Sequence, residues 1–404
     1  MIVEYNPLHH GHLYLVEEVR RRLGPSTAVV AVMSGNVVQR GEFALAGRLA
    51  RARAAVESGV DLVLELPLPW AAAPAERFAG GGVQALLGTG LVTHLAFGSE
   101  CGDAGALGRL AEVLCAPQFP AVLKRELTKG DSFAAARQRA VAQVTGPAPA
   151  QLLASPNNLL GVEYCKALLL CHAGLEVLTV SRTGAPHGAE AAAPGEYASS
   201  SAIRRALREG RREEALALMA PAMAAAYEEE ERAGRAPVFP ASSERAVLSR
   251  LRSMEPEDFA ALDQGGEGLY RRLYDAAHKG RTVGEVLERA KTKRYSHARL
   301  RRMVLWAYLG LTPGDQPERV PYLRVLGANG TGRELLARMR GTAQRPGTAV
   351  LPLLTKPAHI RCLGPEAQAV WALEARAADL YALAYPSLDA AAGGGIWREG
   401  PVML

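Results

Sequence analysis

The first 100 residues alternate between short apolar runs and longer stretches in which apolar residues recur at a helical spacing. The runs at 27–33, 61–66 and 91–97 are continuous and short, as expected for strands buried on both faces of a sheet. Apolar positions three and four residues apart recur in 13–23 and 45–56. With a first strand at the start of the chain, this alternation predicts a Rossmann-like, doubly wound α/β domain with a parallel sheet.

The alternation of strands and helices continues to about residue 180 and then ends. Helical segments are predicted over 103–145 and 157–173, and a fifth strand over 176–180. The tract 183–197 is rich in alanine, glycine and proline, which predicts a mobile loop. Two prolines, a glycine and two serines then occur in 233–243, a composition typical of a linker.

Beyond this linker the pattern is mainly helical. Residues 245–310 and 364–384 are predicted to form helices, with one strand-like run near 321–326. We therefore predict an α/β domain over 1–235 and a mainly α-helical C-terminal domain over 244–404.

Composition narrows the class of protein. Of 404 residues, 49% are hydrophobic and 22% are charged, which is ordinary for a globular protein. The absence of a long apolar run or a leader predicts a cytoplasmic protein with no membrane contact. The five cysteines are odd in number and form no CxxC pair, so neither disulfides nor a zinc site is indicated. The net charge of +6 is compatible with a polyanionic partner, and no protein partner is indicated.

The stretch His9-His10-Gly11-His12 carries the candidate chemistry. Metal binding would need a further carboxylate or thiol at a suitable spacing, and none lies nearby. The simplest alternative is three histidines in a loop or a core. However, the stretch follows the first predicted strand and opens the first helix, the place where α/β folds bind ligands.

A phosphate-binding site is the interpretation of this stretch for which a physical mechanism can be given. Gly11 would let the backbone approach an anion closely, and the helix N-terminus offers free N–H groups. His9 and His12 would donate to phosphate oxygens as charge builds up at phosphorus. The stretch resembles the His-x-Gly-His motif of the adenylyl-transferring nucleotidyltransferases, relatives of the class I aminoacyl-tRNA synthetase catalytic domain.

That superfamily needs a second phosphate contact from a later helix. The stretch 198–204 (ASSSAIR) could supply it, since serines cap helices and Arg204 follows one turn later. Taken alone, this stretch is better explained as a helix cap with a solvated arginine.

Further stretches, distributed over both predicted domains, resemble one family, the bacterial tRNA(Met) cytidine acetate ligases. They are VEYNPLHHGHLY (3–14), VMSGNVVQRGE (32–42), GVDLVLELP (59–67), FGSE (97–100), SPNNLLGVEY (155–164), KTKRYSHARLRR (291–302), YLRVLGANGTGRELL (322–336), LLTKP (353–357) and ADLYAL (378–383). The resemblance implies an enzyme that activates acetate with ATP as acetyl-adenylate. It then transfers the acetyl group to N4 of the wobble cytidine of elongator tRNA(Met).

The resemblance also implies the site residues. His9 and His12, with Ser201 and Arg204 holding pyrophosphate, are the expected catalytic groups. The expected ATP contacts are Ile2, Asn6, Pro7, His9, Gly11, His12, Leu15, Gly98, Asn157 and Arg182. Taken alone, Gly98 is better explained as a turn glycine, Asn157 as a helix cap and Arg182 as a surface charge. Mg²⁺ is expected to accompany ATP, although no ligand set for a metal is evident in the sequence.

The expected RNA surface is the densest basic cluster, which would contact the anticodon stem-loop of tRNA(Met). It comprises Lys291, Lys293, Arg294, Arg299, Arg301 and Arg302, with Tyr295 placed to stack on a base. The alternative is a solvated helix face whose apolar residues point inward.

Two departures from the family stand out. The chain begins almost on its first strand, and Gly47-Arg48 replaces the usual Asp-Lys pair, which puts a phosphate or acetate role at Arg48 in doubt. Two other functions stay open. One is a small-molecule or protein-directed adenylyltransferase or acetate ligase of the same superfamily, and the other is a non-catalytic, nucleotide-sensing RNA-binding protein.

Overall fold

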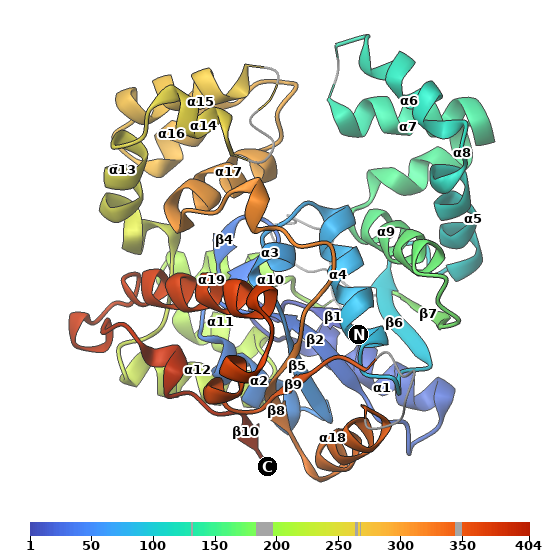
Figure 1. Cartoon of the computed structure of the whole chain (residues 1–404), viewed down its shortest axis with the longest axis vertical. Coiled ribbons are helices and arrows are strands. Elements are labelled where there is room, and N and C mark those ends of the chain that lie inside the picture. Colours follow the sequence, from blue (N-terminus) through green and yellow to red (C-terminus); the bar gives the residue numbers. More distant parts are fainter. Residues whose placement is uncertain (131, 183–196, 263–265, 267, 344–349) are drawn as a thin grey trace.

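The computed structural model describes residues 1–130, 132–182, 197–262, 266, 268–343 and 350–404 (Figure 1). The predicted mobile loop at 183–197 lies outside these residues except for its last position.

In the described residues, six strands form a mixed sheet in the order β1-β2-β5-β8-β10, with β9 also paired to β8. The strands β1, β2 and β5 are parallel, whereas β8 runs antiparallel to β5 and β9 and β10 run parallel to β8. A parallel pair, β6–β7, and a hairpin, β3–β4, form separate sheets. The bounds are β1 Ile2–Val3, β2 Val30–Ser34, β3 Val37–Val38, β4 Glu42–Phe43, β5 Leu62–Leu66, β6 His94–Ser99, β7 Glu176–Ser181, β8 Leu323–Ala328, β9 Leu353–Leu354 and β10 Val402–Met403.

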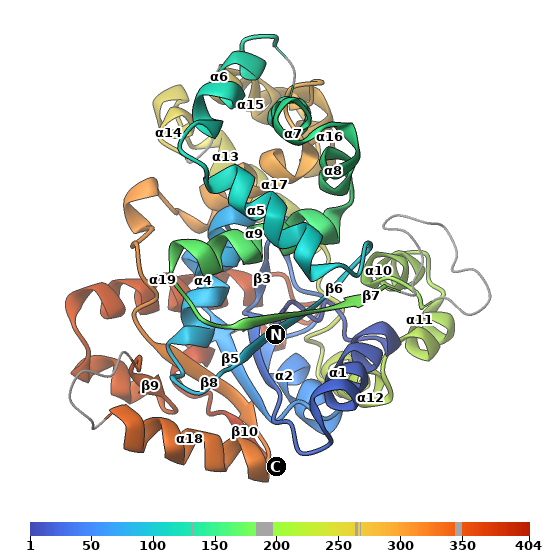
Figure 2. The ribbon, with the colours of Figure 1, turned by 90° about the vertical axis from the view of Figure 1, so that its right-hand side faces the viewer.

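Helices cover both faces of the sheet and extend beyond one end of it. In Figure 1, α13–α17 at the upper left and α5–α9 at the right form two groups that extend beyond the upper end of the sheet. Figure 2 shows β6 and β7 beneath α5 and α9. The helices are α1 His10–Leu23, α2 Arg48–Glu57, α3 Leu68–Ala71, α4 Ala75–Leu87, α5 Ala104–Cys115, α6 Phe119–Leu127, α7 Phe133–Thr145, α8 Pro147–Gln151, α9 Pro156–Leu170, α10 Ser200–Arg208, α11 Arg212–Leu218, α12 Pro221–Arg232, α13 Glu244–Arg252, α14 Pro256–Ala260, α15 Leu269–Lys279, α16 Val283–Ala290, α17 His297–Leu309, α18 Gly330–Ala343 and α19 Pro365–Ala382.

Successive side chains along a strand point to opposite faces of the sheet, so each strand packs against two layers of helices. Side chains of Val32 and Leu64 point to one face and pack with α4, α5, α9 and α18. Their neighbours Ala31 and Val63 point to the other face and pack with α1, α2 and α10–α12. Since both faces are covered, these strands are mainly apolar, with Glu65 on β5 and Arg324 on β8 as buried charged exceptions.

The α/β class and the five internal strands predicted from apolar runs are confirmed. The runs at 27–33, 61–66, 91–97, 176–180 and 321–326 correspond to β2, β5, β6, β7 and β8, with ends displaced by at most three residues. The arrangement differs in two respects. The sheet is mixed because β8 runs against β5, and β6–β7 form a sheet of their own instead of extending the parallel layer.

The expected linker is packed against its surroundings. Val238 N–H donates to Leu45 O at 2.9 Å, and Ser387 N–H donates to Gly234 O at 3.0 Å. The strands β8, β9 and β10 also return from beyond the linker to the central sheet. The regions 1–235 and 244–404 therefore share one sheet, and their division into two domains stays a proposal.

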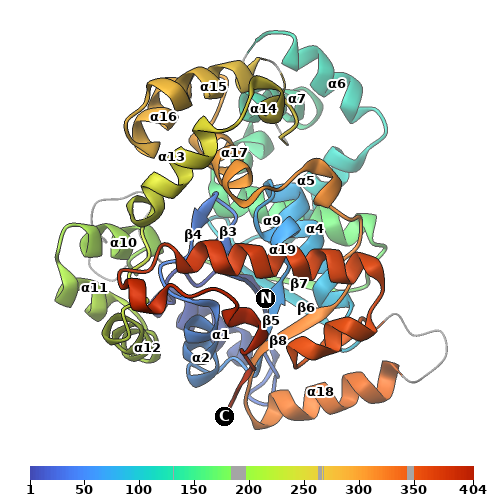
Figure 3. The ribbon, with the colours of Figure 1, turned by 60° about the vertical axis from the view of Figure 1, so that its left-hand side comes forward.

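The helices α13–α17 form an apolar bundle that rests on the β3–β4 hairpin, α3 and α19. Trp306 Nε1 donates to Ala72 O at 2.9 Å, and the ring of Phe43 meets that of Tyr381 edge-on with 5.2 Å between centroids. Figure 3 shows α19 lying between this bundle and the sheet. The bundle is thereby fixed relative to the carboxyl ends of β1 and β2.

A buried network of charges connects the sheet to the C-terminal segments. Glu65 on β5 lies 2.9 Å from Arg324 Nη1 on β8 and 3.7 Å from Arg48 Nε on α2. Glu399 pairs with both arginines. Glu374 on α19 accepts a hydrogen bond from Leu68 N–H close by. Arg48, which stands where the acetate ligase family usually has lysine, is thus 2% exposed and engaged in internal ion pairs.

This network predicts a pH dependence of stability. Burial, followed by the charge of Glu65, raises the pKa of Glu374 from 4.5 to about 8. The folded state therefore keeps a proton on Glu374 that the unfolded state releases above about pH 4.5. The contribution of this proton to the free energy of unfolding is complete below about pH 4.5 and is lost as the pH rises through about 8. We expect the urea midpoint to fall between about pH 6 and pH 8.5. The fall should be smaller in Glu374→Gln, which keeps the acceptor for Leu68 N–H; equal falls would contradict this assignment.

Candidate active site at the first helix

The histidine loop, residues 4–12, leads from β1 into α1. His9 is the N-cap of α1, and its Nδ1 accepts a hydrogen bond from Gly11 N–H at 3.1 Å. His9 N–H in turn donates to Nδ1 of His12 at 3.2 Å. Because both Nδ1 atoms are acceptors, the proton of each neutral ring lies on Nε2. The local sequence thus fixes two N–H donors at the start of α1.

The two rings are packed as a unit. Their centroids lie 3.8 Å apart in a stacked arrangement, and Tyr5 meets His12 edge-on at 5.0 Å. A Cβ at Gly11 would lie only 3.1 Å from Cε1 of His9. A side chain at position 11 would therefore crowd the His9 ring, a second reason for glycine besides close approach to an anion.

Burial keeps both imidazoles uncharged. It lowers the pKa of His9 to about 3, with a smaller contribution from the charge of Arg182. The pKa of His12 is held well below its usual value by burial and by the neighbouring His9 and Arg182. At neutral pH the rings therefore offer neutral N–H donors, and any positive charge at the site comes from arginine.

The carboxyl ends of β6 and β7 place Arg182 beside these rings. Arg182 N–H donates to Ser99 O at 3.0 Å. A Cβ at Gly98 would lie 3.4 Å from Cγ of Arg182, an ordinary contact distance, so the Arg182 side chain passes directly over this backbone. The fold therefore gathers four of the expected ATP residues, His9, His12, Gly98 and Arg182.

Asn157 is held by an acidic residue that sequence reasoning did not single out. Glu100 Oε1 accepts from the Asn157 backbone N–H at 3.2 Å and from its Nδ2 at 2.7 Å. The other oxygen of Glu100 accepts from Asn158 N–H at 2.7 Å. Glu100 thus caps α9 and accepts from one N–H of the Asn157 amide group, which leaves the other N–H and Oδ1 for a ligand. The acid in FGSE, directly after an apolar strand, was the available signal.

The expected second phosphate helix, α10, contacts the histidine loop directly. Ser200 Oγ donates to Pro7 O at 3.2 Å, and Arg204 Nη1 donates to Asn6 O at 2.7 Å. Arg204 Nη2 lies 3.5 Å from Ser201 Oγ. Arg204 therefore positions the loop, and its contact with pyrophosphate stays a prediction.

The remaining expected ATP residues lie in or near the core. The side chain of Ile2 packs under α4, and Leu15 packs against the opposite core. Asn6 Oδ1 accepts from Leu45 N–H at 2.7 Å, which fixes the loop. Contacts of Ile2 and Leu15 with ATP would have to use backbone atoms.

The structure alters the expected RNA surface. Tyr295 is 4% exposed in the helical bundle with Arg299 over its ring, so its faces are not offered to a base. Arg302 is 8% exposed and directed at Gln39 O. Both expectations are corrected, because Tyr295 packs in the core of the helical bundle and Arg302 on α17 faces the turn of the β3–β4 hairpin.

The other members of the cluster divide into two kinds. Arg301 lies 3.3 Å from Glu42 Oε1, and Lys291 Nζ donates to Tyr295 O at 2.7 Å, so both serve internal contacts. Lys293 and Arg294 are exposed. These two are the members that the fold leaves on the surface.

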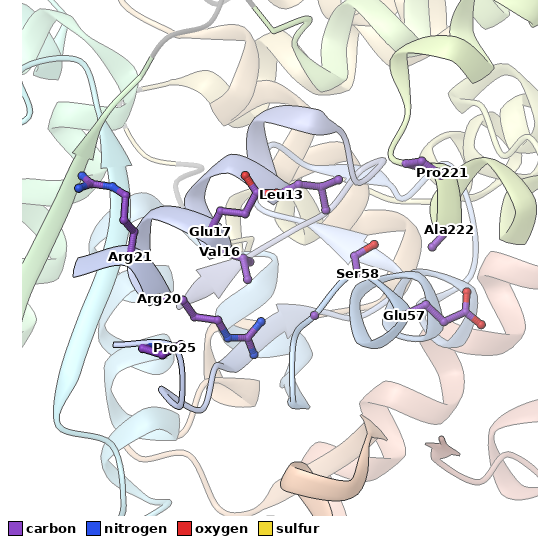
Figure 4. Close-up of a pocket in the computed structure, with 11 residues that line it drawn as sticks. Leu13, Val16, Glu17, Arg20, Arg21, Pro25, Glu57, Ser58, Pro221 and Ala222 are labelled. Carbon is purple, nitrogen blue, oxygen red and sulfur yellow. The ribbon is translucent and has the colours of Figure 1, made fainter. Parts of the chain in front are cut away.

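A cavity of about 850 Å³ lies on the outer side of α1 (Figure 4). Leu13, Val16, Arg20 and Pro221 are among its lining residues, at the junction of α1, α2 and α12. None of the predicted site residues lines it, so it is distinct from the candidate site.

The described ranges contain neither a cluster of metal ligands nor a membrane-spanning helix. No group of three histidine, cysteine, aspartate or glutamate residues is arranged to hold a metal ion. No helix there has the length and apolar character needed to cross a bilayer.

Comparison with known proteins identifies the family. Residues 1–393 match the family model described as HIGH Nucleotidyl Transferase. A protein of Acetivibrio thermocellus named tRNA(Met) cytidine acetate ligase is 36% identical over 399 residues, covering 95% of this chain and 94% of the relative. Two crystal structures of Thermotoga maritima TmcAL are 32% identical and cover 100% of this chain and 98% of theirs. The apo form has a TM-score of 0.93, and the form bound with alpha-thio ATP has 0.90. The chain therefore belongs to the HIGH nucleotidyl transferase family and, within it, to the tRNA(Met) cytidine acetate ligases.

Proposed function

We propose that this chain is an ATP-dependent ligase that acetylates N4 of the wobble cytidine of tRNA(Met) in the cytoplasm. The observation that carries the proposal is the pair of fixed Nε2–H donors of His9 and His12 beside Arg182, in a chain that aligns with the acetate ligases along nearly its whole length. The basic C-terminal bundle favours this function over transfer to a small molecule.

The first half-reaction needs little from the protein besides positioning. An acetate oxygen attacks the α-phosphorus of ATP, and pyrophosphate leaves. His9 and His12 donate to phosphate oxygens as their charge increases, while Arg182 supplies the nearby cation. Orientation contributes much of the rate, since acetate is a weak nucleophile. Mg²⁺ would accompany the phosphates and offset their charge.

In the second half-reaction, the anticodon stem-loop binds at the edge of the sheet where the histidine loop lies. The cytidine amine attacks the acetyl carbon, and AMP leaves. The wobble base must be turned outward to reach the acetyl-adenylate.

The proposal is tested by incubating the chain with ATP, Mg²⁺, labelled acetate and transcribed tRNA(Met), followed by nucleoside analysis. We expect N4-acetylcytidine in tRNA(Met) and none in a transcript with uridine at the wobble position. Label in a small molecule or protein would indicate another ligase of the superfamily. ATP binding without acetate-dependent pyrophosphate release would indicate a nucleotide sensor.

The exposed pair Lys293 and Arg294 gives a prediction for tRNA binding. Charge reversal of both residues should weaken tRNA affinity and reduce the slope of log K against log salt by about 1.5, because each phosphate contact contributes about 0.7 to 0.9. The matched control is Lys279→Glu with Arg281→Glu, which makes the same charge change elsewhere on the bundle. Equal slopes in the two double variants would exclude Lys293 and Arg294 as phosphate contacts.

A further inference from the structure

Glu4 is the first residue after β1 and lies in the histidine loop. One carboxylate oxygen, Oε1, accepts from Gln39 N–H of the β3–β4 hairpin at 2.7 Å. The backbone carbonyl of Glu4 accepts from Arg51 Nη1 at 2.6 Å, which fixes the residue from the other side. The second oxygen, Oε2, has no hydrogen-bond partner and no ion pair among the described residues. The side chain is half-buried, so this oxygen is held in place and still accessible.

The charges around Glu4 come from several elements. Arg40 of the hairpin, Arg51 of α2 and Arg204 of α10 face it, and Tyr164 of α9 lies within its electrostatic reach. Burial raises the pKa of Glu4, and the hydrogen bond from Gln39 N–H and the three arginines oppose that rise without cancelling it. The carboxylate is therefore more basic than an exposed one, which suits proton transfer near neutral pH.

Acetyl transfer to cytidine requires a base. The N4 lone pair is conjugated with the ring, and the nitrogen becomes acidic once it bonds to the acetyl carbon. The two histidines are unsuited to accept this proton. Their Nδ1 atoms already accept hydrogen bonds from the backbone, and their Nε2 atoms carry protons.

Two other carboxylates lie near the histidine loop or Arg182, and both are engaged. Glu42 lies 3.3 Å from Arg301 and 3.8 Å from Arg204. Both oxygens of Glu100 accept from the N-terminus of α9. Compared with these two, Glu4 alone keeps an oxygen without a partner.

We propose that Glu4 is the general base of acetyl transfer, an inference that rests on the proposed function. As the N4–C bond forms, the proton of N4 passes to Glu4 Oε2. The bond between the acetyl carbon and the phosphate oxygen breaks, and AMP leaves with that electron pair. Glu4 then releases its proton to solvent. The first half-reaction has no proton to remove, so it does not use Glu4.

The test compares Glu4→Gln with the parent in two assays. Glutamine keeps the acceptor for Gln39 N–H but cannot take a proton. We expect acetate-dependent ATP–pyrophosphate exchange without tRNA to stay within about twofold, which also shows that the variant is folded. Single-turnover acetyl transfer to tRNA(Met) should fall by about 100-fold or more. The transfer rate of the parent should decrease at acid pH as Glu4 protonates, and this decrease should be absent in Glu4→Gln.

Glu17→Gln, on the outer side of α1 beside the cavity of Figure 4, is the control and should match the parent in both assays. A parallel loss of exchange and transfer in Glu4→Gln would overturn the proposal and assign Glu4 to the ATP site or the fold. Unchanged transfer would also overturn it. If the parent itself showed no acetate-dependent exchange, the proposed function would fail instead, so the two failures are distinguishable.

Discussion

Replacing His12 with alanine is expected to lower acetate-dependent pyrophosphate exchange by at least about 10² to 10³-fold. That is the typical loss when one donor to a developing oxyanion is removed. The variant also removes the acceptor for His9 N–H and the ring stacked on His9, so His9 is then held by the hydrogen bond from Gly11 N–H. Affinity for tRNA should be almost unchanged, because the bundle and its exposed basic residues are untouched. Exchange assays and tRNA binding measured on one preparation separate the two effects.

Two further variants at His12 separate the donor from the helix cap. His12→Asn places an oxygen near the position of Nδ1 and can still accept from His9 N–H, but it lacks a donor at the position of Nε2. His12→Gln places its amide nitrogen near Nε2. We expect Asn to be nearly as inactive as Ala, and Gln to recover part of the rate. Full exchange activity in His12→Ala would refute the phosphate role of this ring.

Replacing Glu65 with leucine should destabilise the fold by about 3 to 5 kcal/mol, since it leaves two buried arginines with the partly exposed Glu399 as their remaining shared partner. Glu65 is 2% exposed and pairs with Arg48 and Arg324, so water cannot compensate for the loss. The urea midpoint of the variant, followed by circular dichroism, measures the effect.

The matched control removes an exposed pair. Glu57 lies 2.9 Å from Arg53 at the surface of α2, where Glu57→Leu should cost no more than about 1 kcal/mol. If Glu65→Leu were no more harmful than Glu57→Leu, the buried network would not be holding β5 to β8.

The strands could be predicted because each is a short apolar run, but their pairing could not. Nothing in the composition of LRVLGA (323–328) indicates that β8 runs against β5, since an apolar strand looks the same in either direction. Similarly, β6 and β7 resemble β2 in sequence and yet form a separate pair. Direction and neighbour depend on packing between distant segments, which a local pattern does not contain.

The same contrast applies to the site. His9, Gly11 and His12 could be assigned from sequence because the cap they form is contained within a few residues. The burial of Tyr295 and Arg302 could not be predicted in this way, because it depends on the packing of the helical bundle and, for Arg302, on the hairpin at 37–43, far away in the chain. The role proposed for Glu4 could not be predicted from its motif, because its unpartnered oxygen becomes evident only when the neighbouring residues are placed around it.

The completion of the sheet by β8 and β10 has a consequence for synthesis. While the chain emerges from the ribosome, the histidine loop and β5 appear long before residues 323–328. Until then the edge of β5 is open, and an unpaired apolar edge invites pairing with other nascent chains. A fragment that stops before β8 would therefore carry the nucleotide motif and still be prone to aggregate, so the enzyme becomes competent only near the end of translation.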